Sequence, residues 1–210
     1  MPAIAWAATI RLMQEVETAR LRLRMFTPDD LNPLSVIFAD PDVMEYLGRD
    51  GLPIPTEETA LVLTSIIRHW QTHGFGRWAM EDKAEGRLIG YAGIRSLEGQ
   101  AELVYLLAKE YWGMGLATEV ALACLKYGFT EKCFPSILAL TRPRNVRSRR
   151  VMEKIGMRFE KDANYFGIDV VQYVIERREY KADDTLYRVR PVAADSADAT
   201  PDRHGLTLRF

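Results

Sequence analysis

The sequence predicts a mixed α/β domain, and three stretches carry that prediction. Residues 76–95 read as an antiparallel hairpin, residues 102–119 as a strand that turns sharply into a helix, and residues 137–155 as a further strand and helix. Antiparallel strands beside a strand–helix–strand unit make a mixed sheet with one parallel crossover. The hairpin at 76–95 argues against an all-parallel nucleotide-binding sheet.

Composition places the chain among ordinary globular proteins. Its 210 residues suit one domain with a short appendage, and it is 48% apolar and 27% charged. The net charge of −1 gives no drive toward nucleic acid or anionic membrane. Cys124 and Cys133 are too few for a disulfide framework, and residues 1–13 lack the basic start of a secretory signal. We therefore expect a cytoplasmic protein, and no stretch approaches the roughly 18 apolar residues of a membrane span.

The first third of the chain predicts one strand and three helices. In order we expect a strand at 21–26, a helix opened by residues 27–30, a short helix at 40–47, a Gly- and Pro-rich loop at 48–55 and a helix from 56 to Gly74. Thr27 can cap the first helix, and Pro28 suits its first turn. The long helix has an apolar stripe of Leu63, Ile66, Ile67 and Trp70.

The middle and end of the chain alternate strands with two helices. We expect strands at 76–81, 88–95 and 102–107, a helix at 115–132, a strand at 137–140, a helix at 145–155 and closing strands at 158–165 and 170–178. Asn145 can cap its helix, and Gly156 can end it. Cys124 shares a helix face with Val120 and Tyr127, which predicts a core residue rather than a nucleophile.

The two ends differ in composition from the domain between them. Residues 1–16 predict an extension that packs on the domain or a neighbour, and residues 17–181 the domain itself. Residues 182–210 are rich in Ala, Asp, Pro, Ser and Thr, and we expect a largely mobile tail. Two apolar clusters, 186–192 and 206–210, could each add a short strand.

The turn at residues 113–117 is the strongest local signal for a ligand. Gly113, Gly115 and Ala117 let the backbone turn sharply and approach a ligand closely. The helix that follows directs its first free N–H groups and its positive dipole end at this turn. The stretch therefore predicts an anion site suited to a phosphate or pyrophosphate. The alternative is a tight strand-to-helix turn without a ligand.

The order of elements and several motifs resemble the GNAT N-acetyltransferases. The motifs are Gly-Met-Gly-Leu-Ala at 113–117 and the run from Asn145 to Met157. Features of the ribosomal-protein-alanine N-acetyltransferase branch lie at residues 17–24, 75–78 and 112–119. This resemblance covers residues 17–180. It implies a mostly antiparallel twisted sheet with helices on both faces and splayed central strands.

The resemblance implies an acetyl-CoA-dependent enzyme without a metal. The pyrophosphate would lie on backbone N–H groups of Met114, Gly115, Leu116, Ala117 and Thr118. The pantetheine arm would run along the strand at 102–107, beside Leu106 and Leu107. The N–H of Leu107 falls where the family polarises the thioester carbonyl, and such a donor would stabilise an oxyanion.

Two residues near the second motif match family positions. Asn145 matches an Asn that contacts the pantetheine arm, and Ser148 matches a Ser proposed as the acid for the leaving thiolate. Each also reads as a plain helix-start residue. Many members have a Tyr that acts as the general acid where this chain has Met152. The acid here is therefore Ser148, a Tyr from elsewhere, or water. Many also carry Arg or Gln at the position of Glu110, which the backbone cradle does not need.

A base must deprotonate the acceptor, because an alkyl ammonium titrates near pH 10. Glu102 is the first candidate, since it begins the strand beside the cofactor and this branch often carries Glu there. The alternative is a strand-end carboxylate in water. Asp169 and Tyr165 are second choices. His69 and His73 read as solvated or satisfied helix residues.

The sequence as a whole favours an N-acetyltransferase that works by direct attack on the thioester. The acceptor is an amine, either a protein N-terminus or a small molecule, and residues 46–55 and 164–169 would line its site. Five arginines between 142 and 150 could bind the CoA 3′-phosphate, an acidic partner or RNA, although the near-neutral charge argues against nucleic acid. The alternative function is a catalytically weak CoA-binding regulatory module. Monomer and homodimer both remain open.

Overall fold

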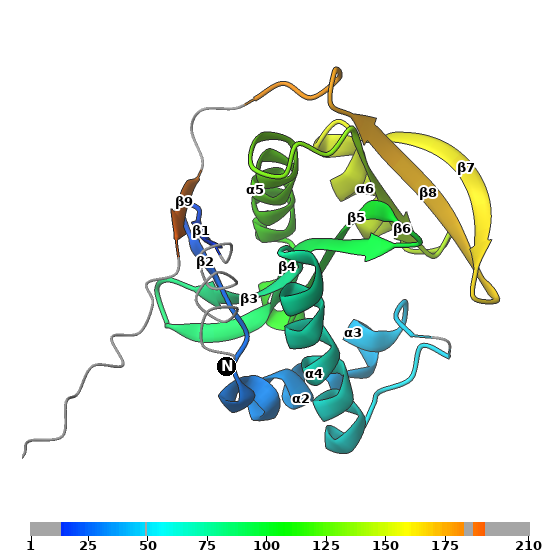
Figure 1. Cartoon of the computed structure of the whole chain (residues 1–210). Helices are drawn as coiled ribbons and strands as arrows, with labels where there is room; N and C mark the ends of the chain where they lie inside the picture. The colour runs from blue at the N-terminus through cyan, green and yellow to red at the C-terminus, as the bar shows by residue number, and fades with distance from the viewer. Residues whose placement is uncertain (1–13, 49, 183–186, 192–210) are drawn as a thin grey trace, which may run out of the picture.

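A nine-stranded sheet forms the centre of the computed structural model, which describes residues 14–48, 50–182 and 187–191 (Figure 1). The strands are β1 (Gln14–Glu17), β2 (Leu21–Arg24), β3 (Arg77–Asp82), β4 (Arg87–Leu97), β5 (Gln100–Leu107), β6 (Ser136–Thr141), β7 (Arg158–Tyr165), β8 (Ile168–Glu176) and β9 (Arg188–Pro191). The helices are η1 (Pro28–Asp30), α2 (Leu31–Phe38), α3 (Pro41–Met44), α4 (Thr56–His73), η2 (Lys109–Tyr111), α5 (Leu116–Thr130) and α6 (Val146–Lys154).

The sheet is mixed, as the sequence predicts. Its strand order is β7-β8-β6-β5-β4-β3-β2-β1-β9. Every neighbouring pair is antiparallel except β5 and β6, which are parallel. Helix α5 makes the crossover that a parallel pair requires.

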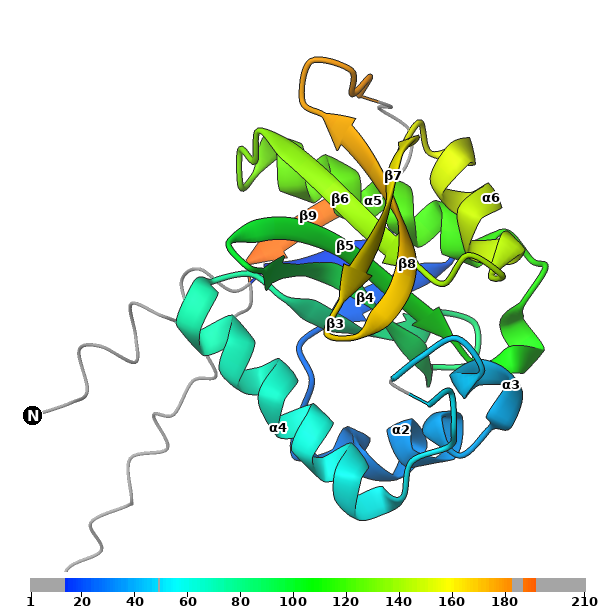
Figure 2. The same ribbon diagram turned by 90° about the vertical axis from the view of Figure 1, so that its right-hand side faces the viewer.

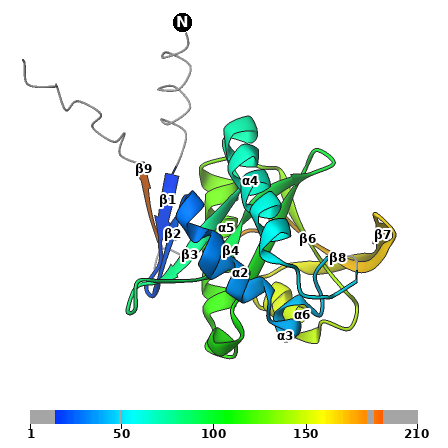
Figure 3. The ribbon, with the colours of Figure 1, turned by 90° about the horizontal axis from the view of Figure 1, so that it is seen from below.

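Helices cover both faces of the sheet, with α2 and α4 on one side and α5 and α6 on the other (Figures 2 and 3). On the first side, called the α4 face below, Phe38 of α2 packs edge-on against Tyr91 of β4 at 6.3 Å between ring centroids. On the second side, the α5 face, Tyr127 of α5 packs edge-on against Trp78 of β3 at 4.7 Å. Helices α2, α4 and α5 each bury several apolar side chains against the sheet, which is why the layers hold together.

The apolar stripes predicted from the sequence form this core. In α4, Leu63, Ile66 and Trp70 are buried, while Ile67 is only partly buried. In α5, Cys124 is fully buried, and burial raises the pKa of its thiol far above its usual range. Cys124 is therefore a core residue, as predicted, and not a nucleophile. Within the described ranges, no helix has both the length and the apolar character needed to cross a bilayer.

Several boundaries differ from the predicted ones. The helix after Thr27 starts as the single 3₁₀ turn η1 before α2 continues it, and α3 ends at Met44 rather than at residue 47. Asp40 caps α3 by accepting a hydrogen bond from the Asp42 N–H at 2.8 Å. The chain then leaves the helix through a turn in which the Leu47 N–H donates to Met44 O.

Strand β1 is an addition that local patterns do not predict, and β9 lies within the apolar cluster at 186–192 that could add a short strand. Residues 14–16 belong to the expected extension and residues 188–191 to the expected mobile tail, yet β1 pairs with both β2 and β9. Val16 of β1 is fully buried, and the Trp78 indole donates to Gln14 O at 2.7 Å. The pairing with β1 gives residues 188–191 the short strand that the apolar cluster at 186–192 allowed for within the expected tail. Residues 1–13, 183–186 and 192–210 lie outside the described residues.

An ion-pair network joins β2 to the first helical turn, η1, and to β3. Arg24 of β2 contacts Asp30 at 2.7 Å and Glu81 of β3 at 2.5 Å. Asp30 also accepts the Thr27 N–H at 2.8 Å. Burial alone would raise the pKa of Asp30, but the hydrogen bonds from Arg24 and Thr27 hold it below its usual range.

Asp30→Asn should destabilise the fold by about 2 kcal/mol at pH 7, because Arg24 keeps its charge and loses its best-buried partner. The folded-state pKa of Asp30 is depressed, so its contribution is complete above the unfolded value of about 3.9. This contribution to stability is lost as the pH falls from the unfolded pKa of Asp30 through its lower pKa in the folded state. Urea unfolding of both proteins at pH 7 and pH 3 measures this difference.

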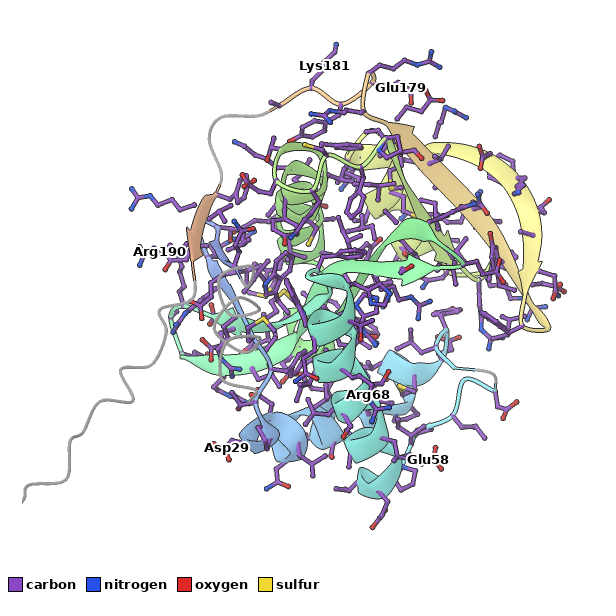
Figure 4. All side chains as sticks on the ribbon, viewed as in Figure 1. Asp29, Glu58, Arg68, Glu179, Lys181 and Arg190 are labelled. Carbon is purple, nitrogen blue, oxygen red and sulfur yellow. The ribbon has the colours of Figure 1, made fainter. Side chains whose placement is uncertain are left out.

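The matched control is Asp29→Asn, since Asp29 is adjacent, exposed and directed outward (Figure 4). We expect it to change the free energy of unfolding by less than about 0.5 kcal/mol. A gap between wild type and Asp30→Asn that persists undiminished at pH 3 would contradict the role given to this carboxylate.

Candidate active site

The two central strands separate after a single pair of residues. Strand β5 pairs with β4 along its full length, and β6 does the same with β8. Between β5 and β6, however, the pairing consists of Glu102 opposite Leu138. Beyond this pair β5 and β6 share no further ladder pairs, and the space between their facing edges is called the groove below. The splay expected of the central strands is confirmed.

The groove edge of β5 carries backbone groups that β4 does not use. The Ala108 N–H donates to Ile89 O at 2.8 Å, toward the β4 side. Successive residues of a strand direct their N–H groups to opposite sides, so the Leu107 N–H faces the groove. The indole of Trp112 donates to Leu107 O at 2.8 Å and fixes this end of the strand. Leu106 and Leu107 thus lie at the end of the groove.

The predicted turn lies immediately after this strand end. Gly113 and Gly115 have φ of 76° and 79°, the left-handed region in which an L side chain is strained. A Cβ at Gly113 would meet nothing within 4 Å, so conformation rather than space calls for glycine there. These two residues turn the chain into α5.

The first turn of α5 presents free backbone donors. The Glu119 N–H donates to Gly115 O at 3.1 Å and begins the helix ladder, and no side chain caps the helix. The N–H groups of Leu116, Ala117 and Thr118 therefore lack helical acceptors. Met114 is exposed at the tip of the turn. The arrangement is an open anion cradle at the positive end of a 15-residue helix.

A clamp that the sequence reading missed holds this cradle. The Glu119 carboxylate accepts hydrogen bonds from Thr18 Oγ1 at 2.5 Å, from the Arg20 N–H at 2.9 Å and from Arg20 Nε at 2.7 Å. Arg20 also donates to Met114 O at 2.8 Å. Burial alone would raise the pKa of Glu119, but the bonds from Thr18 and Arg20 hold it below its usual range. The motifs at 17–24 and 112–119 were the available signal, because they supply both halves of the clamp.

Glu102, the proposed base, lies at the point where β5 and β6 part. It is 3% exposed, and its Oε2 accepts a hydrogen bond from Arg95 Nε of β4 at 2.5 Å. Burial alone would lower the pKa of Arg95, but the attraction and hydrogen bond of Glu102 raise it. The alternative interpretation of Glu102 as a carboxylate in water is wrong. In the described part of the chain, no donor is bonded to its Oε1.

Ser148, the proposed acid, is hydrogen-bonded to a tyrosine. Its Oγ lies 2.9 Å from the hydroxyl of Tyr105, which projects from β5 toward α6. Burial raises the pKa of Tyr105 to about 12, although the bond to Ser148 works against this. Tyr105 therefore keeps its proton at neutral pH and can donate it. Met152, at the position where relatives carry a Tyr, is buried in the core.

Asn145 caps α6 as predicted. Its Oδ1 accepts a hydrogen bond from the Ser148 N–H at 3.1 Å. The plain helix-cap interpretation is thus confirmed, and no described residue is hydrogen-bonded to the Nδ2 group. The cap also fixes the start of the helix from which Ser148 reaches Tyr105.

The proposed base and acid lie on opposite faces of the sheet. Arg95 and Glu102 are cross-strand partners on the same face as Tyr91, the α4 face. Tyr105 is three residues after Glu102 in β5, and side chains alternate between the two faces of a strand, so Tyr105 lies on the opposite face. Its hydrogen bond to Ser148 of α6 places it on the α5 face. A group held in the groove between β5 and β6 is therefore accessible to one from each side.

The second-choice residues have local partners. Asp169 accepts a hydrogen bond from Asn164 Nδ2 at 2.8 Å, and Tyr165 donates to Gln172 Oε1 at 3.1 Å. Both ring nitrogens of His69 are engaged: Nδ1 lies 2.9 Å from Phe75 O, and Nε2 accepts the Ser96 N–H at 3.0 Å. Burial lowers the pKa of His69, so it is a satisfied helix residue as predicted.

The arginines between 142 and 150 do not act as one patch. Arg142 donates to Gly48 O at 2.8 Å, which ties the start of α6 to the loop at 46–55. Arg149 donates to the Tyr173 hydroxyl at 3.2 Å. Arg147 stacks over the Trp112 ring at 5.0 Å, beside the glycine turn. Of these three, Arg147 is the one placed to meet a ligand at the cradle.

A cavity of about 420 Å³ lies at the opposite end of the groove from the glycine turn. Its lining comes from the segment before β3, the end of β4 and the start of β5 with the turn between them, the start of β6 with the segment before it, and strands β7 and β8. These residues are Phe75, Ser96, Gly99, Gln100, Ala101, Phe134, Pro135, Ser136, Leu138, Glu160, Lys161, Gln172 and Val174. It contains none of the predicted site residues. Among the described residues, no three His, Cys, Asp or Glu side chains gather to hold a metal ion.

Comparison with known protein families matches one model to this chain. It is described as "Acetyltransferase (GNAT) domain" and aligns with residues 20–158. An uncharacterised Bacillus subtilis protein, YkkB, is 38% identical over 168 residues, which is 78% of this chain and 95% of the relative. The uncharacterised N-acetyltransferase YoaA of the same organism is 28% identical and covers 69% of this chain and 83% of the relative.

Several solved structures have the same fold. A GNAT-family acetyltransferase from Bacillus anthracis has a TM-score of 0.69 at 28% identity and covers 79% of this chain and 99% of its own. A ribosomal-protein-S5-alanine acetyltransferase from Vibrio fischeri has a TM-score of 0.66 at 17% identity, covering 80% and 99%. A spermidine N-acetyltransferase from Vibrio cholerae, solved with CoA and spermine, has 0.65 at 22%, covering 77% and 98%.

Glu119→Gln should weaken the binding of inorganic pyrophosphate to the cradle by about three- to tenfold, because the clamp loses charge-assisted hydrogen bonds. Isothermal titration calorimetry measures the dissociation constant. The control is Glu110→Gln, since Glu110 is exposed on η2 and its removal changes the net charge equally. Equal effects of the two substitutions would mean that charge, and not the clamp, governs binding.

Proposed function

Because this chain belongs to the GNAT acetyltransferase family, we propose that it transfers the acetyl group of acetyl-CoA to a primary amine, with Glu102 as base and the Tyr105–Ser148 pair as acid. The observation that carries this proposal is the parting of β5 and β6 next to the glycine turn. The groove and the cradle together match a long substrate with a pyrophosphate at one end.

The proposed contacts of acetyl-CoA follow the unpaired backbone groups. The pyrophosphate lies on the N–H groups from Met114 to Thr118, with Arg147 nearby as a cation for further phosphate. The pantetheine arm extends along β5 past Leu106 and Leu107. Asn145 Nδ2 contacts the arm from α6. These roles are supported by the N–H groups that helix α5 and strand β4 leave unused.

The proposed reaction is direct attack from the α4 face. An acceptor ammonium near Glu102 loses a proton to the free Oε1, through water, while Arg95 holds Oε2. The neutral amine attacks the thioester carbon, and the Leu107 N–H stabilises the oxyanion. As the C–S bond breaks, the thiolate takes a proton from Tyr105, and Ser148 stabilises the tyrosine oxygen through their hydrogen bond. The nitrogen still carries one proton too many after the attack, and this proton passes to the Tyr105 oxygen, while Glu102 releases its proton to solvent. The products are an N-acetyl amine and CoA.

No acyl-enzyme is required by this scheme. Cys124, the thiol nearest the sheet core, is fully buried in α5 and cannot reach a substrate. Both described cysteines are free thiols, which supports a reducing compartment such as the cytoplasm. The acceptor is a protein N-terminus or a small amine, bound under the loops at 46–55 and 164–169.

Glu102→Gln should lower kcat for acetyl transfer by about 100-fold or more, because the amide cannot accept the proton. The dissociation constant for acetyl-CoA should stay within about twofold. Thiol release during turnover of an accepted amine measures the first quantity, and calorimetry the second. Glu98→Gln, in the exposed β4–β5 turn, is the control and should leave kcat unchanged. Unchanged turnover of Glu102→Gln would remove Glu102 as the base.

Tyr105→Phe and Ser148→Ala should each lower kcat by about 10- to 100-fold, since each breaks the same proton donor. The double variant should be no slower than the slower single variant, because groups that act as a unit are not additive. The kinetics of thiol release for all four proteins decide this. Independent, multiplying losses would show that the two hydroxyls do not act together.

The alternative is a regulatory module that binds CoA without turnover. Met152 favours this alternative, because it cannot donate a proton where many family members have a tyrosine. Tyr105 argues against it, because it brings a tyrosine hydroxyl from another element. A wild-type protein that binds acetyl-CoA but releases no thiol with any amine in a broad panel would favour the module over the enzyme.

A further inference from the structure

A charged cluster lies on the α4 face, beside the proposed point of attack. It consists of Arg77 on β3, Tyr91 and Arg95 on β4, and Glu102 on β5. Strand register places them together: Arg77 is opposite Gly93, which separates Tyr91 from Arg95, and Arg95 is opposite Glu102. Phe38 of α2 packs on Tyr91 from the same side. The mechanism above uses Arg95 and Glu102 and leaves Arg77 without a role.

Arg77 differs from Arg95 in lacking a carboxylate partner. Arg95 is paired with Glu102 at 2.5 Å. Among the described residues, no carboxylate oxygen lies within 4 Å of the Arg77 guanidinium, whose neighbour is the Tyr91 ring at 5.6 Å. Two guanidinium groups and one carboxylate leave the cluster with one positive charge in excess. Burial lowers the pKa of Arg77, which marks a poorly hydrated cation.

A tyrosine ring compensates such a cation less well than an anion does. Partly desolvated charges in proteins are ordinarily paired, because the attraction of an opposite charge offsets lost hydration. Arg77 is mostly buried but keeps an exposed part, which a ligand can reach. The planar guanidinium matches a carboxylate in a bidentate geometry.

The position of Arg77 relative to the groove limits where the missing anion lies. Tyr91 is opposite Leu106, at the end of the groove, and Arg77 is one strand further from it. Neighbouring strands are about 4.8 Å apart, so Arg77 lies about 10 Å from β5. An amine at the groove would therefore present a second group, a few bonds away, to Arg77.

We propose that Arg77 binds a carboxylate of the acceptor, so that the acceptor is a small amino acid and not a polyamine. This inference rests on the proposed function. A polyamine would bring further positive charge to a cluster that already has one in excess, which like-charge repulsion disfavours. The same carboxylate could come from an acidic peptide, and the test below separates the two sources.

The test compares amines that differ only in the anion. Thiol release is measured with 4-aminobutanoate, with 4-aminobutanamide, with spermidine and with a short peptide that has an acidic second residue. In the wild type, we expect kcat/KM for the acid to exceed that for its amide by at least about tenfold. In Arg77→Gln this ratio should fall to about one, and Arg77→Lys should retain part of it. Arg68→Gln, an exposed arginine of α4, is the control and should keep the wild-type ratio (Figure 4).

Three results would overturn the proposal: a wild type that prefers the amide or spermidine, a ratio unchanged in Arg77→Gln, or activity with the acidic peptide alone. Binding of 4-acetamidobutanoate and of its amide to the CoA complex, by calorimetry, gives a readout independent of turnover. Arg77-dependent preference for the acid in binding, with no thiol release from any amine, would sustain the role of Arg77 and refute the proposed function. Equal binding of acid and amide would refute the role of Arg77.

Discussion

The structure depends on a sheet whose two parallel strands cannot stay paired. Strand β5 is held along its length by β4, and β6 by β8, and these two halves share one residue pair, Glu102 with Leu138. Past that pair the inner edges carry N–H and C=O groups that need a partner, because unpaired backbone polar groups are costly when water is excluded. Helix α5, which must cross between the two strands, starts at the open end of the groove. The groove and the anion cradle are thus consequences of the same crossover.

This constraint also places the proposed acid and the proposed base on opposite faces of the sheet. The crossover puts α5 and α6 on one face, where Tyr105 and Ser148 meet, and leaves α2 and α4 on the other, where Arg95 orients Glu102. A thioester held between the strands is reached by the acceptor from the α4 face and by the proton donor from the α5 face. The clamp of Glu119 on Arg20 adds the turn between β1 and β2 to this arrangement, since it holds the turn that sets the cradle.

Much of this organisation is readable in the sequence, and the part that is not has a physical reason. The hairpin, the glycine turn, the cap at Asn145 and the buried Cys124 follow from local chemistry. Strands β1 and β9 pair segments more than 170 residues apart, and no local pattern specifies such pairing. The partners of Glu102 and Ser148 depend on register. One signal was available: the two-residue turn between Leu97 and Gln100 fixes Arg95 opposite Glu102. The role of Tyr105 could not be predicted, because it depends on where α6 lies relative to β5, and the sequence does not give that position.

The central claim is that acetyl-CoA binds the unpaired backbone of β5 and α5. Amide hydrogen exchange of the protein with and without acetyl-CoA tests it most directly, because it reports each N–H group. The account predicts slowed exchange at Leu107 and at residues 116–118, and little change in β2 and β3, whose N–H groups are bonded within the sheet. Protection confined to the residues around the 420 Å³ cavity, with none at the glycine turn, would contradict it.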